Sequence, residues 1–459
     1  MSVPDCDNIS LDSRELENSH IDFCEIVKRV ELDDGVYGEL ILLGYNGAYD
    51  NKNAIPVKRH RTKMVLSRRK FGNGIKKGGV IQSNSDGKDA PAVLDRSRHV
   101  VSYTYSKKQT VLVEYLTDTA KDMFQIGRSS EDQIDFTIVD TWLASNAHGS
   151  LQGNINPKEK RSMASTISRY ACRILIDREN PGKSYLYAAG FDSMKNIFLG
   201  EKATKWNKKN GEVDGLTTNG VLILHPNRNT EDLLDDSNSD MYVWREVSVD
   251  GDIFALRETR SSNARGELIP EETNMLQDGS LIDLCGATLL WRTSDGLAKS
   301  PTLMELENAL DRLNAGKPQC PVNLNTLIIP KKKSGSTVSS RQPYVYLRCG
   351  HVQGKHKWGV QETGGLTMSK CPICLEESER ILQLTMGMES SFHLDSGTLD
   401  HAFNPCGHVA SKNTVLYWSR IPLPHGTNSF YPVCPFCTTL LATEKPYVKL
   451  IFQDHLYDT

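Results

Sequence analysis

PCGHVASKN (residues 405–413) lies between two further stretches that are rich in cysteine, CPIC at 371–374 and CPFC at 434–437. Each of the three holds two metal-binding side chains one or two residues apart, a spacing at which a tight turn lets both bind one ion. Two tetrahedral ions need eight ligands and so a fourth pair. None follows CGH directly, where Ala410 and Asn413 stand. The completing pair lies upstream instead, because the motif CGH also occurs before CPIC.

The four pairs supply eight ligands, which is enough to close two tetrahedral zinc sites. The order CGHV, a tryptophan (Trp358 or Trp418), then CPxC occurs twice, so we expect each repeat to hold one structural zinc ion. The ligands are then Cys349, His351, Cys371 and Cys374 for the first ion, and Cys406, His408, Cys434 and Cys437 for the second. An interleaved arrangement, which joins the first and third pairs, remains open.

Length and composition set the class of protein. The 459 residues suffice for two to four domains, and the net charge of −3 provides no overall field for nucleic acid or membranes. The start MSVPDCDNIS does not resemble a secretory signal, and no apolar run approaches the roughly 20 residues of a membrane span. Seven of the 11 cysteines follow residue 300, which favours metal ligands in a reducing compartment over disulfides. We expect a cytoplasmic protein with no membrane partner.

Short β-rich runs such as VVSYTYS, TVLVEYL and ATLLWRT, punctuated by Gly, Asn, Asp and Pro, dominate residues 100–292. This pattern is typical of a β-sandwich. We therefore expect a mainly β protein with an acidic, mostly disordered tail at 1–35, a sandwich at 36–298, a helix at 299–316 and a separately folded zinc-binding domain at 317–459. Polar loops are expected at 143–165 and 227–240.

The single predicted helix is marked at both ends. Ser300 can cap its start, Pro301 suits its first turn, and Gly316 follows its last residue. The leucines at 303, 306, 310 and 313 form one stripe, which predicts a packing face rather than a binding site.

A basic insert is expected at about 51–98. Nine Lys or Arg residues fall between Lys58 and Lys77, and residues 51–85 contain no Asp or Glu. A solvated surface segment is the favoured interpretation, and a targeting or nucleic-acid patch is the alternative. The run lacks the series of interleaved aromatic side chains that stack on bases, so we expect no nucleic-acid partner.

Longer stretches identify a family. CPICLEE, PCGH and CPFC resemble the RING family of ubiquitin ligases, in a variant that begins with CGH. DMFQIGRS, TISRYACRI, AAGFDSMKNIFLGEKA, DGLTTNG and LQDGSLIDLCGATLLWRT closely resemble the Pellino family, from about Tyr37 to the C-terminus. The resemblance implies a forkhead-associated-type β-sandwich with appendage insertions, followed by a RING-like zinc domain.

The forkhead-associated domain of this family is implied to read phosphothreonine through three turns. In this sequence the matching residues are Arg128, after Gly127, then Ser168, Arg169, Thr218 and Asn219. Guanidinium groups and a hydroxyl are suitable donors to a phosphate dianion, and Asn219 can fix the peptide backbone. The family pattern often has a histidine three residues after the serine, where this chain has Ala171.

The RING resemblance implies a mechanism without a covalent ubiquitin intermediate. Such domains bind a charged ubiquitin-conjugating enzyme and favour the reactive posture of its thioester. By position, the contact residues are expected to be Ile373, Trp418 and Pro435. Thr438 follows the last cysteine, where many active domains place Arg or Lys, so intrinsic activity is expected to be modest unless another residue takes that role.

Together these features predict a ubiquitin ligase and scaffold. The resemblance implies that it binds phosphorylated interleukin-1-receptor-associated (Pelle-like) kinases and directs their ubiquitination in Toll-type innate signalling. The alternative is a non-catalytic phosphothreonine-binding adaptor whose zinc module is structural. Chain assembly by the purified protein with a conjugating enzyme would separate the two.

Overall fold

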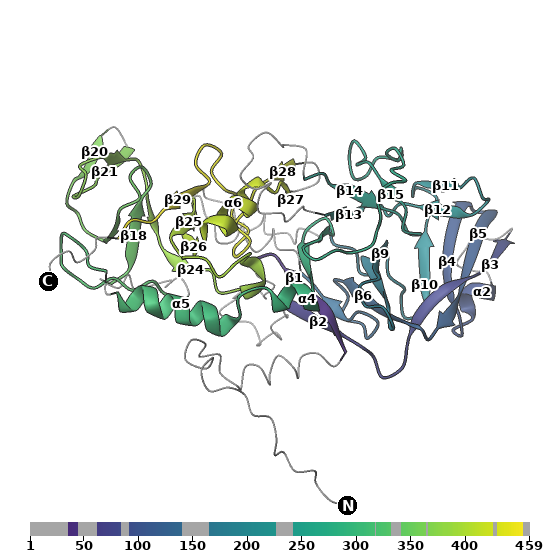
Figure 1. Cartoon of the computed structure of the whole chain (residues 1–459). Coiled ribbons are helices and arrows are strands. Elements are labelled where there is room, and N and C mark those ends of the chain that lie inside the picture. Colours follow the sequence, from purple (N-terminus) through teal and green to yellow (C-terminus); the bar gives the residue numbers. More distant parts are fainter. Residues whose placement is uncertain are drawn as a thin grey trace, which may run out of the picture.

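The structure is a computed structural model that describes residues 35–44, 62–83, 91–139, 165–225, 242–316, 318–331, 341–363, 366–425 and 429–452. The tail expected at 1–35 and the loops expected at 143–165 and 227–240 lie outside these ranges, except for Gly35 and Ser165. Figure 1 shows two β-rich halves, the first coloured purple to teal and the second green to yellow. No described helix is long and apolar enough to cross a bilayer.

A β-sandwich forms the centre of the first half. Its larger sheet contains β1 (Val36–Leu42), β2 (Lys63–Ser67), β13 (Val221–Leu224), β14 (Arg245–Val247), β15 (Ile253–Phe254), β16 (Leu281–Asp283) and β17 (Thr288–Thr293), in the order β15-β14-β13-β16-β17-β1-β2. The facing sheet contains β6 (Lys121–Gly127), β7 (Phe136–Thr137), β8 (Cys172–Asp177) and β9 (Ser184–Ala188), in the order β7-β6-β8-β9. Neighbouring strands of the larger sheet are antiparallel.

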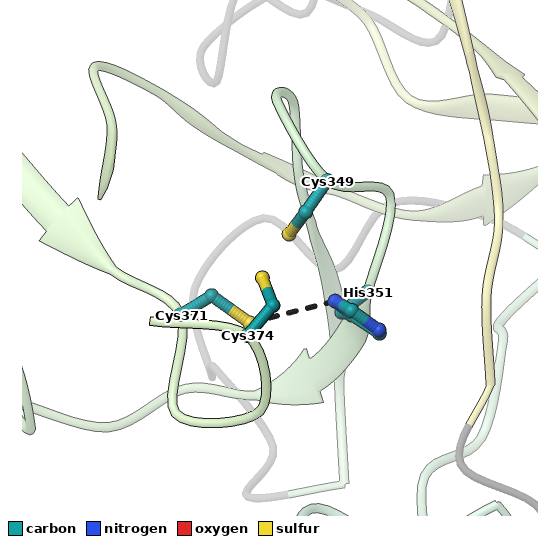
Figure 2. A group of neighbouring side chains, drawn as sticks. All are labelled: Cys349, His351, Cys371 and Cys374. Carbon is teal, nitrogen blue, oxygen red and sulfur yellow. Dashed lines mark hydrogen bonds between the residues drawn. The ribbon is translucent and has the colours of Figure 1, made fainter. Parts of the chain in front are cut away.

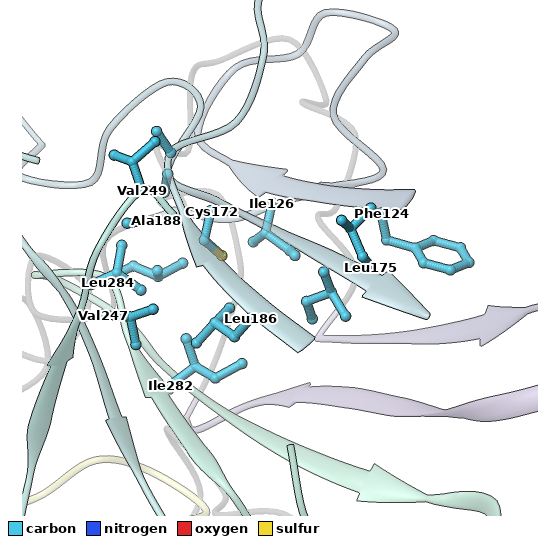
Figure 3. Packing of buried hydrophobic residues seen from close by; sticks show 14 of the residues in the cluster. Phe124, Ile126, Cys172, Leu175, Leu186, Ala188, Val247, Val249, Ile282 and Leu284 are labelled. Atoms are coloured by element: carbon cyan, nitrogen blue, oxygen red, sulfur yellow. The ribbon is translucent and has the colours of Figure 1, made fainter. Parts of the chain in front are cut away.

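The sandwich core lies between these two sheets. Ile126 of β6 and Leu186 of β9 pack in one cluster with Val247 of β14 and Ile282 of β16 from the larger sheet (Figure 3). Complete burial of side chains of this size contributes roughly 1.5–3 kcal/mol each. The core therefore holds the ends of β6 and β8, and the turns beyond them, in fixed positions.

A third sheet extends the first half. It contains β3 (Gly74–Ser83), β4 (His99–Ser106), β5 (Gln109–Asp118) and β10 (Asn196–Leu199), in the order β10-β4-β5-β3, and is accompanied by the hairpin β11 (Lys205–Asn207) and β12 (Val213–Gly215) and by the short helix α2 (Pro91–Leu94).

The stretch expected as a basic insert is partly built into these sheets. Its described residues include β2, which pairs with β1, and β3, which pairs with β5. The described part of the basic stretch therefore forms edge strands at 63–67 and 74–83, most of whose side chains are exposed or partly exposed. The strand pattern was hidden because edge strands carry lysine and glycine on their exposed sides. Lys77 of β3 forms an ion pair with Asp250 at 2.6 Å.

The expected helix is shorter than 299–316. It appears as α5 (Leu303–Ala315), after a separate short helix α4 (Ser294–Ala298). The cap is Thr302 rather than Ser300: the Thr302 hydroxyl accepts from Glu305 N at 3.1 Å, and the Glu305 carboxylate accepts from Thr302 N at 2.6 Å. Glu three residues after Thr is a capping-box signal that identifies this start. Gly316 ends the helix as predicted.

The second half consists of small sheets. One contains β18 (Pro343–Tyr346), β19 (Val352–Gly354) and β23 (Ile381–Gln383), and another contains β24 (Thr385–Met386), β25 (His401–Phe403), β26 (His408–Ala410) and β29 (Tyr447–Lys449). The others contain β20 (Val360–Thr363), β21 (Leu366–Lys370) and β22 (Glu377–Ser378), or β27 (Leu423–His425) and β28 (Ser429–Tyr431). The helical segments are η4 (Ser390–Phe392) and α6 (Lys412–Arg420).

The two halves share a hydrophobic core. Ile41 and Leu222 of the larger sheet belong to the same buried cluster as Trp418 and Cys434 of the zinc-binding half. Hydrogen bonds also cross the junction, including Trp244 Nε1 to Pro422 O at 2.6 Å. The two halves therefore pack closely on one another. Sequence could not show this packing, because the contacting residues are far apart in the chain, by 178 positions for Trp244 and Pro422.

Candidate functional site

The first Cys/His cluster joins two turns of the zinc-binding half (Figure 2). Cys349 and His351 lie on the turn between β18 and β19, whereas Cys371 and Cys374 lie on the turn between β21 and β22. The candidate ligand atoms all lie within 4.8 Å of one another. His351 Nδ1 is 3.7 Å from Cys371 Sγ.

The second cluster repeats this arrangement. Cys406 lies on the turn between β25 and β26, His408 begins β26, and Cys434 and Cys437 follow β28. His408 Nδ1 is 3.4 Å from Cys406 Sγ and 3.6 Å from Cys434 Sγ. The side chains are thus grouped in the sequential order, and the interleaved grouping of Cys349 with Cys406 is not the one that the fold adopts.

The donor sets fit zinc. Zn–S bonds of about 2.3 Å and Zn–N bonds of about 2.0–2.1 Å at tetrahedral angles place sulfur and nitrogen about 3.5 Å apart. Burial raises the pKa of Cys349 to about 12 and also raises the pKa values of Cys406 and Cys434. A dication supplies the charge that would keep such buried thiolates ionised. These residues therefore support zinc binding.

The sequence repeat is also a structural repeat. Gly350 and Gly407 hold φ angles of 78° and 73° between their paired ligands, a conformation that favours glycine. Each CPxC turn closes with the same hydrogen bond, Leu375 N to Cys371 O at 2.9 Å and Thr438 N to Cys434 O at 2.8 Å. The two ligand frames therefore share one backbone geometry.

The two repeats exchange strands. The chain that leaves the first repeat pairs with the second, where Thr385 N donates to Gly407 O at 3.0 Å. The chain that leaves the second repeat returns to the first, where Ile451 N donates to Gly350 O at 2.8 Å. Both contacts are parallel pairings onto a ligand histidine, Thr385 onto His408 and Ile451 onto His351. Each ligand turn is therefore braced by the chain that follows the other.

The predicted conjugating-enzyme contacts divide between the repeats. Ile373 of the first repeat is 39% exposed. Trp418 is only 1% exposed, and its Nε1 donates to Phe392 O at 2.9 Å. Pro435 is buried, and its carbonyl accepts from Gly44 N at 2.9 Å. The expectation that Trp418 and Pro435 form a contact surface is wrong, because the second repeat packs against the sandwich.

The internal repeat could have indicated other exposed side chains. Trp358 and Leu375 of the first repeat occupy the places of Trp418 and Thr438 in the second. They are 44% and 56% exposed. Thr438, by contrast, lies against Gly44, just beyond the end of β1, since a Cβ on Gly44 would lie 2.5 Å from its Cγ2. A long basic side chain at 438 would meet the end of β1.

The three predicted phosphate-binding turns lie side by side on the sandwich. Arg128 Nε donates to Ile167 O at 2.8 Å, next to Ser168 and Arg169. Asn219 Nδ2 donates to Thr166 O at 2.5 Å, which joins the third turn to the second. Arg128, Arg169 and Thr218 are exposed, and Ser168 and Asn219 are partly exposed. The fold therefore brings the predicted donors to one surface.

A pocket of about 680 Å³ opens beside these turns. Ser168, Arg169 and Thr218 line one side of it, and the chain from Asn196 to Ala203 lines another. Ala171, which stands where the family pattern often has histidine, is buried in the sandwich core. The pocket is large enough to accept a few side chains next to the predicted phosphate donors.

Known proteins resemble this chain over nearly its whole length. The family model "Pellino, FHA domain" matches residues 29–309, and the model "Pellino, RING domain" matches residues 313–457. Protein pellino of Drosophila melanogaster is 52% identical over 92% of this chain and 93% of its own length. The human E3 ubiquitin-protein ligase pellino homolog 2 is 48% identical over 91% and 95%. The mouse E3 ubiquitin-protein ligase pellino homolog 3 is 48% identical over 92% and 90%.

Proposed function

Because this chain belongs to the Pellino family and is a RING-type ubiquitin ligase, we propose that it ubiquitinates kinases that it captures through phosphothreonine. The proposed target is a phosphorylated kinase of the interleukin-1-receptor-associated, Pelle-like group, bound in the cytoplasm during Toll-type innate signalling. The observation that carries the proposal is the meeting of three phosphate-binding turns in a molecule that also carries the zinc module.

The proposed phosphate ligands are Arg128, Ser168 and Arg169, with Thr218 and Asn219 at the peptide backbone. Two guanidinium groups on separate turns balance a phosphate dianion better than one. Arg128 and Arg169 are both exposed, so a ligand can reach them. Arg169 also lies over the ring of Tyr170, with 5.6 Å from Cζ to the ring centroid, and this contact limits its freedom.

The zinc module is proposed to act by positioning. Two zinc ions, one for each cluster, would hold the ligand turns rigid, and neither would take part in chemistry because four protein donors close each site. The conjugating enzyme is proposed to contact the first repeat at Ile373, since the other two expected contacts are buried. No residue of this chain needs to form a bond to ubiquitin in such a transfer.

The test reconstitutes transfer with conjugating enzyme, ubiquitin and an autophosphorylated Pelle-like kinase, beside the same kinase after phosphatase treatment. Faster ubiquitination of the phosphorylated kinase is expected, and Arg128→Ala should remove that preference while chain formation without kinase persists. Ile373→Ala should slow all transfer. Its matched control is Leu440→Ala, because the two side chains are 39% and 40% exposed. If the protein forms no ubiquitin chains with any conjugating enzyme, that result would favour the adaptor alternative.

A further inference from the structure

The turn that carries Thr218 and Asn219 is held from behind by two buried ion pairs. It links β12 to β13 and closes with Gly220 N donating to Thr217 O at 3.2 Å. Arg257 Nη2 donates to the same Thr217 carbonyl at 2.9 Å. Arg260 Nη1 donates to the Asn219 carbonyl at 3.3 Å. Two guanidinium groups therefore fix both ends of a turn whose side chains face outward.

Each guanidinium is balanced by a carboxylate on the sandwich. Arg257 binds Glu246 of β14 with two hydrogen bonds, Nε to Oε2 at 2.9 Å and Nη2 to Oε1 at 2.6 Å, and both side chains are almost fully buried. Arg260 binds Asp283 of β16, which is also buried. Burial of charges is costly, so removal of one partner alone would leave an unpaired charge in the interior.

The turn also packs directly on the first pair. A Cβ at position 220 would lie 2.5 Å from Glu246 Oε1 and 3.3 Å from Arg257 Nη2, and Gly220 has a φ of 70°. Both arginines come from an irregular segment after β15, so no strand register requires them to be there. The same turn reaches the neighbouring phosphate-binding turn through Asn219 Nδ2 and Thr166 O.

We infer that the Glu246–Arg257 and Asp283–Arg260 pairs are positioning residues of the phosphothreonine site. They fix the turn from Thr217 to Gly220 so that Thr218 and Asn219 stand at a set distance from Arg128 and Ser168. Neither arginine touches the ligand, and each keeps its charge balanced by its own carboxylate. The inference rests on the proposed phosphothreonine binding and adds to it the groups that hold the site in its binding geometry.

The test is a double variant, Arg257→Met with Glu246→Leu, in the full chain. It removes both charges together, so neither is left unpaired, and it removes the bond to Thr217 O. The probe is the best-binding phosphothreonine peptide from an array, beside its unphosphorylated twin, at a temperature where every variant is folded. We expect affinity for the phosphopeptide to fall about tenfold, with little change in zinc content.

The matched control is Arg178→Met with Asp122→Leu. This pair, 3.2 Å apart, is likewise largely buried, but Asp122 lies at the end of β6 opposite to Arg128. A purely structural role predicts a lower unfolding temperature with unchanged phosphopeptide affinity, and that result for the Arg257–Glu246 variant overturns the inference. Equal loss of affinity in the variant and its control overturns it as well.

A second variant applies if the double variant fails to fold. Arg260→Lys keeps the charge opposite Asp283 but cannot also reach Asn219 O, so affinity should fall roughly three- to tenfold. Unchanged affinity would contradict the inference. Equal binding of both peptides by the unmutated chain is a different outcome, because it removes the proposed phosphothreonine function itself.

Discussion

The two zinc-binding repeats have the same ligand geometry but opposite surroundings. Both place a glycine with positive φ between their first two ligands, and both close their CPxC turns with the same hydrogen bond. Yet Trp358 of the first repeat is 44% exposed, whereas Trp418 of the second is 1% exposed. The comparison teaches that one copy of a motif can serve as packing for the neighbouring domain while the other keeps its surface for a partner.

Loss of a ligand should reveal this difference most strongly. Structural zinc stabilises small domains by on the order of 10–16 kcal/mol, so loss of either ion should unfold its surroundings. Cys349→Ala should leave about one zinc per chain and an intact sandwich. Cys406→Ala should also lower the unfolding temperature of the sandwich and weaken phosphopeptide binding, because its repeat shares a core with Ile41 and Leu222. Elemental analysis and calorimetry of both variants measure these effects.

Equal effects of the two variants on the sandwich would break the comparison. A zinc content of one or none in the unmutated chain would contradict the assignment of two sites. Cys320→Ala serves as a control, since Cys320 is buried in the zinc-binding half but belongs to neither cluster. It should keep the zinc content of the unmutated chain.

The two tryptophans should differ in how much each stabilises the folded chain. Trp418→Ala removes a buried ring and its bond to Phe392 O, so the free energy of unfolding should fall by about 3–5 kcal/mol. Trp358→Ala removes a half-exposed ring, and the loss should be about 1 kcal/mol or less. Urea unfolding measures both. A larger loss for Trp358→Ala would show that the first repeat is buried by something else in solution.

Sequence indicated the ligand frames because local turn chemistry determines them. CGH and CPxC carry their own glycine and proline, and the doubled order of CGHV, Trp and CPxC suggested the grouping of the ligands. The same reasoning failed for Trp418 and Pro435, since their burial depends on β1 and on residues about 200 positions away. The cap at Thr302 was visible in its Glu305 partner, but Ser300 and Pro301 gave a competing signal. Arg257 and Arg260 carry no local signal at all.

Asp214, in the first half, and the zinc ligands should contribute to the pH dependence of stability in opposite directions. Burial raises the pKa of Asp214 to about 6, although Lys208 lies 3.6 Å away, with Asp250 and Asp252 on the same lysine. Between about pH 4 and 6 Asp214 in the folded chain holds a proton that it releases in the unfolded chain, so its contribution to stability falls as pH rises through that window. The zinc ligands protonate as pH falls, so the zinc-binding half should lose stability towards acid.

Asp214→Asn should remove this contribution, so that stability between pH 4 and 6 falls less, or rises more, with pH than in the unmutated chain, as followed by calorimetry at each pH. The amide oxygen can still accept from Gly215 N and Asp250 N, the two backbone donors of Asp214 Oδ1. Zinc release on acidification should not change in this variant. A slope that stays the same would assign the pH dependence to other groups.

The smallest expected effect tests whether the first repeat and the sandwich respond separately to local changes. Thr302 caps α5, whose buried Leu306 and Leu310 belong to the same core as Val345 of the first repeat, whereas Thr293 caps α4, which contacts β1 and β17 of the sandwich. Loss of either threonine cap should cost about 1 kcal/mol. Thr302→Ala should therefore increase amide exchange in β18 and β19, and Thr293→Ala should increase it in β1 and β17. If both substitutions increased amide exchange in the same strands, the first repeat and the sandwich would not open independently. The second repeat, which shares a core with the sandwich, would then couple the two.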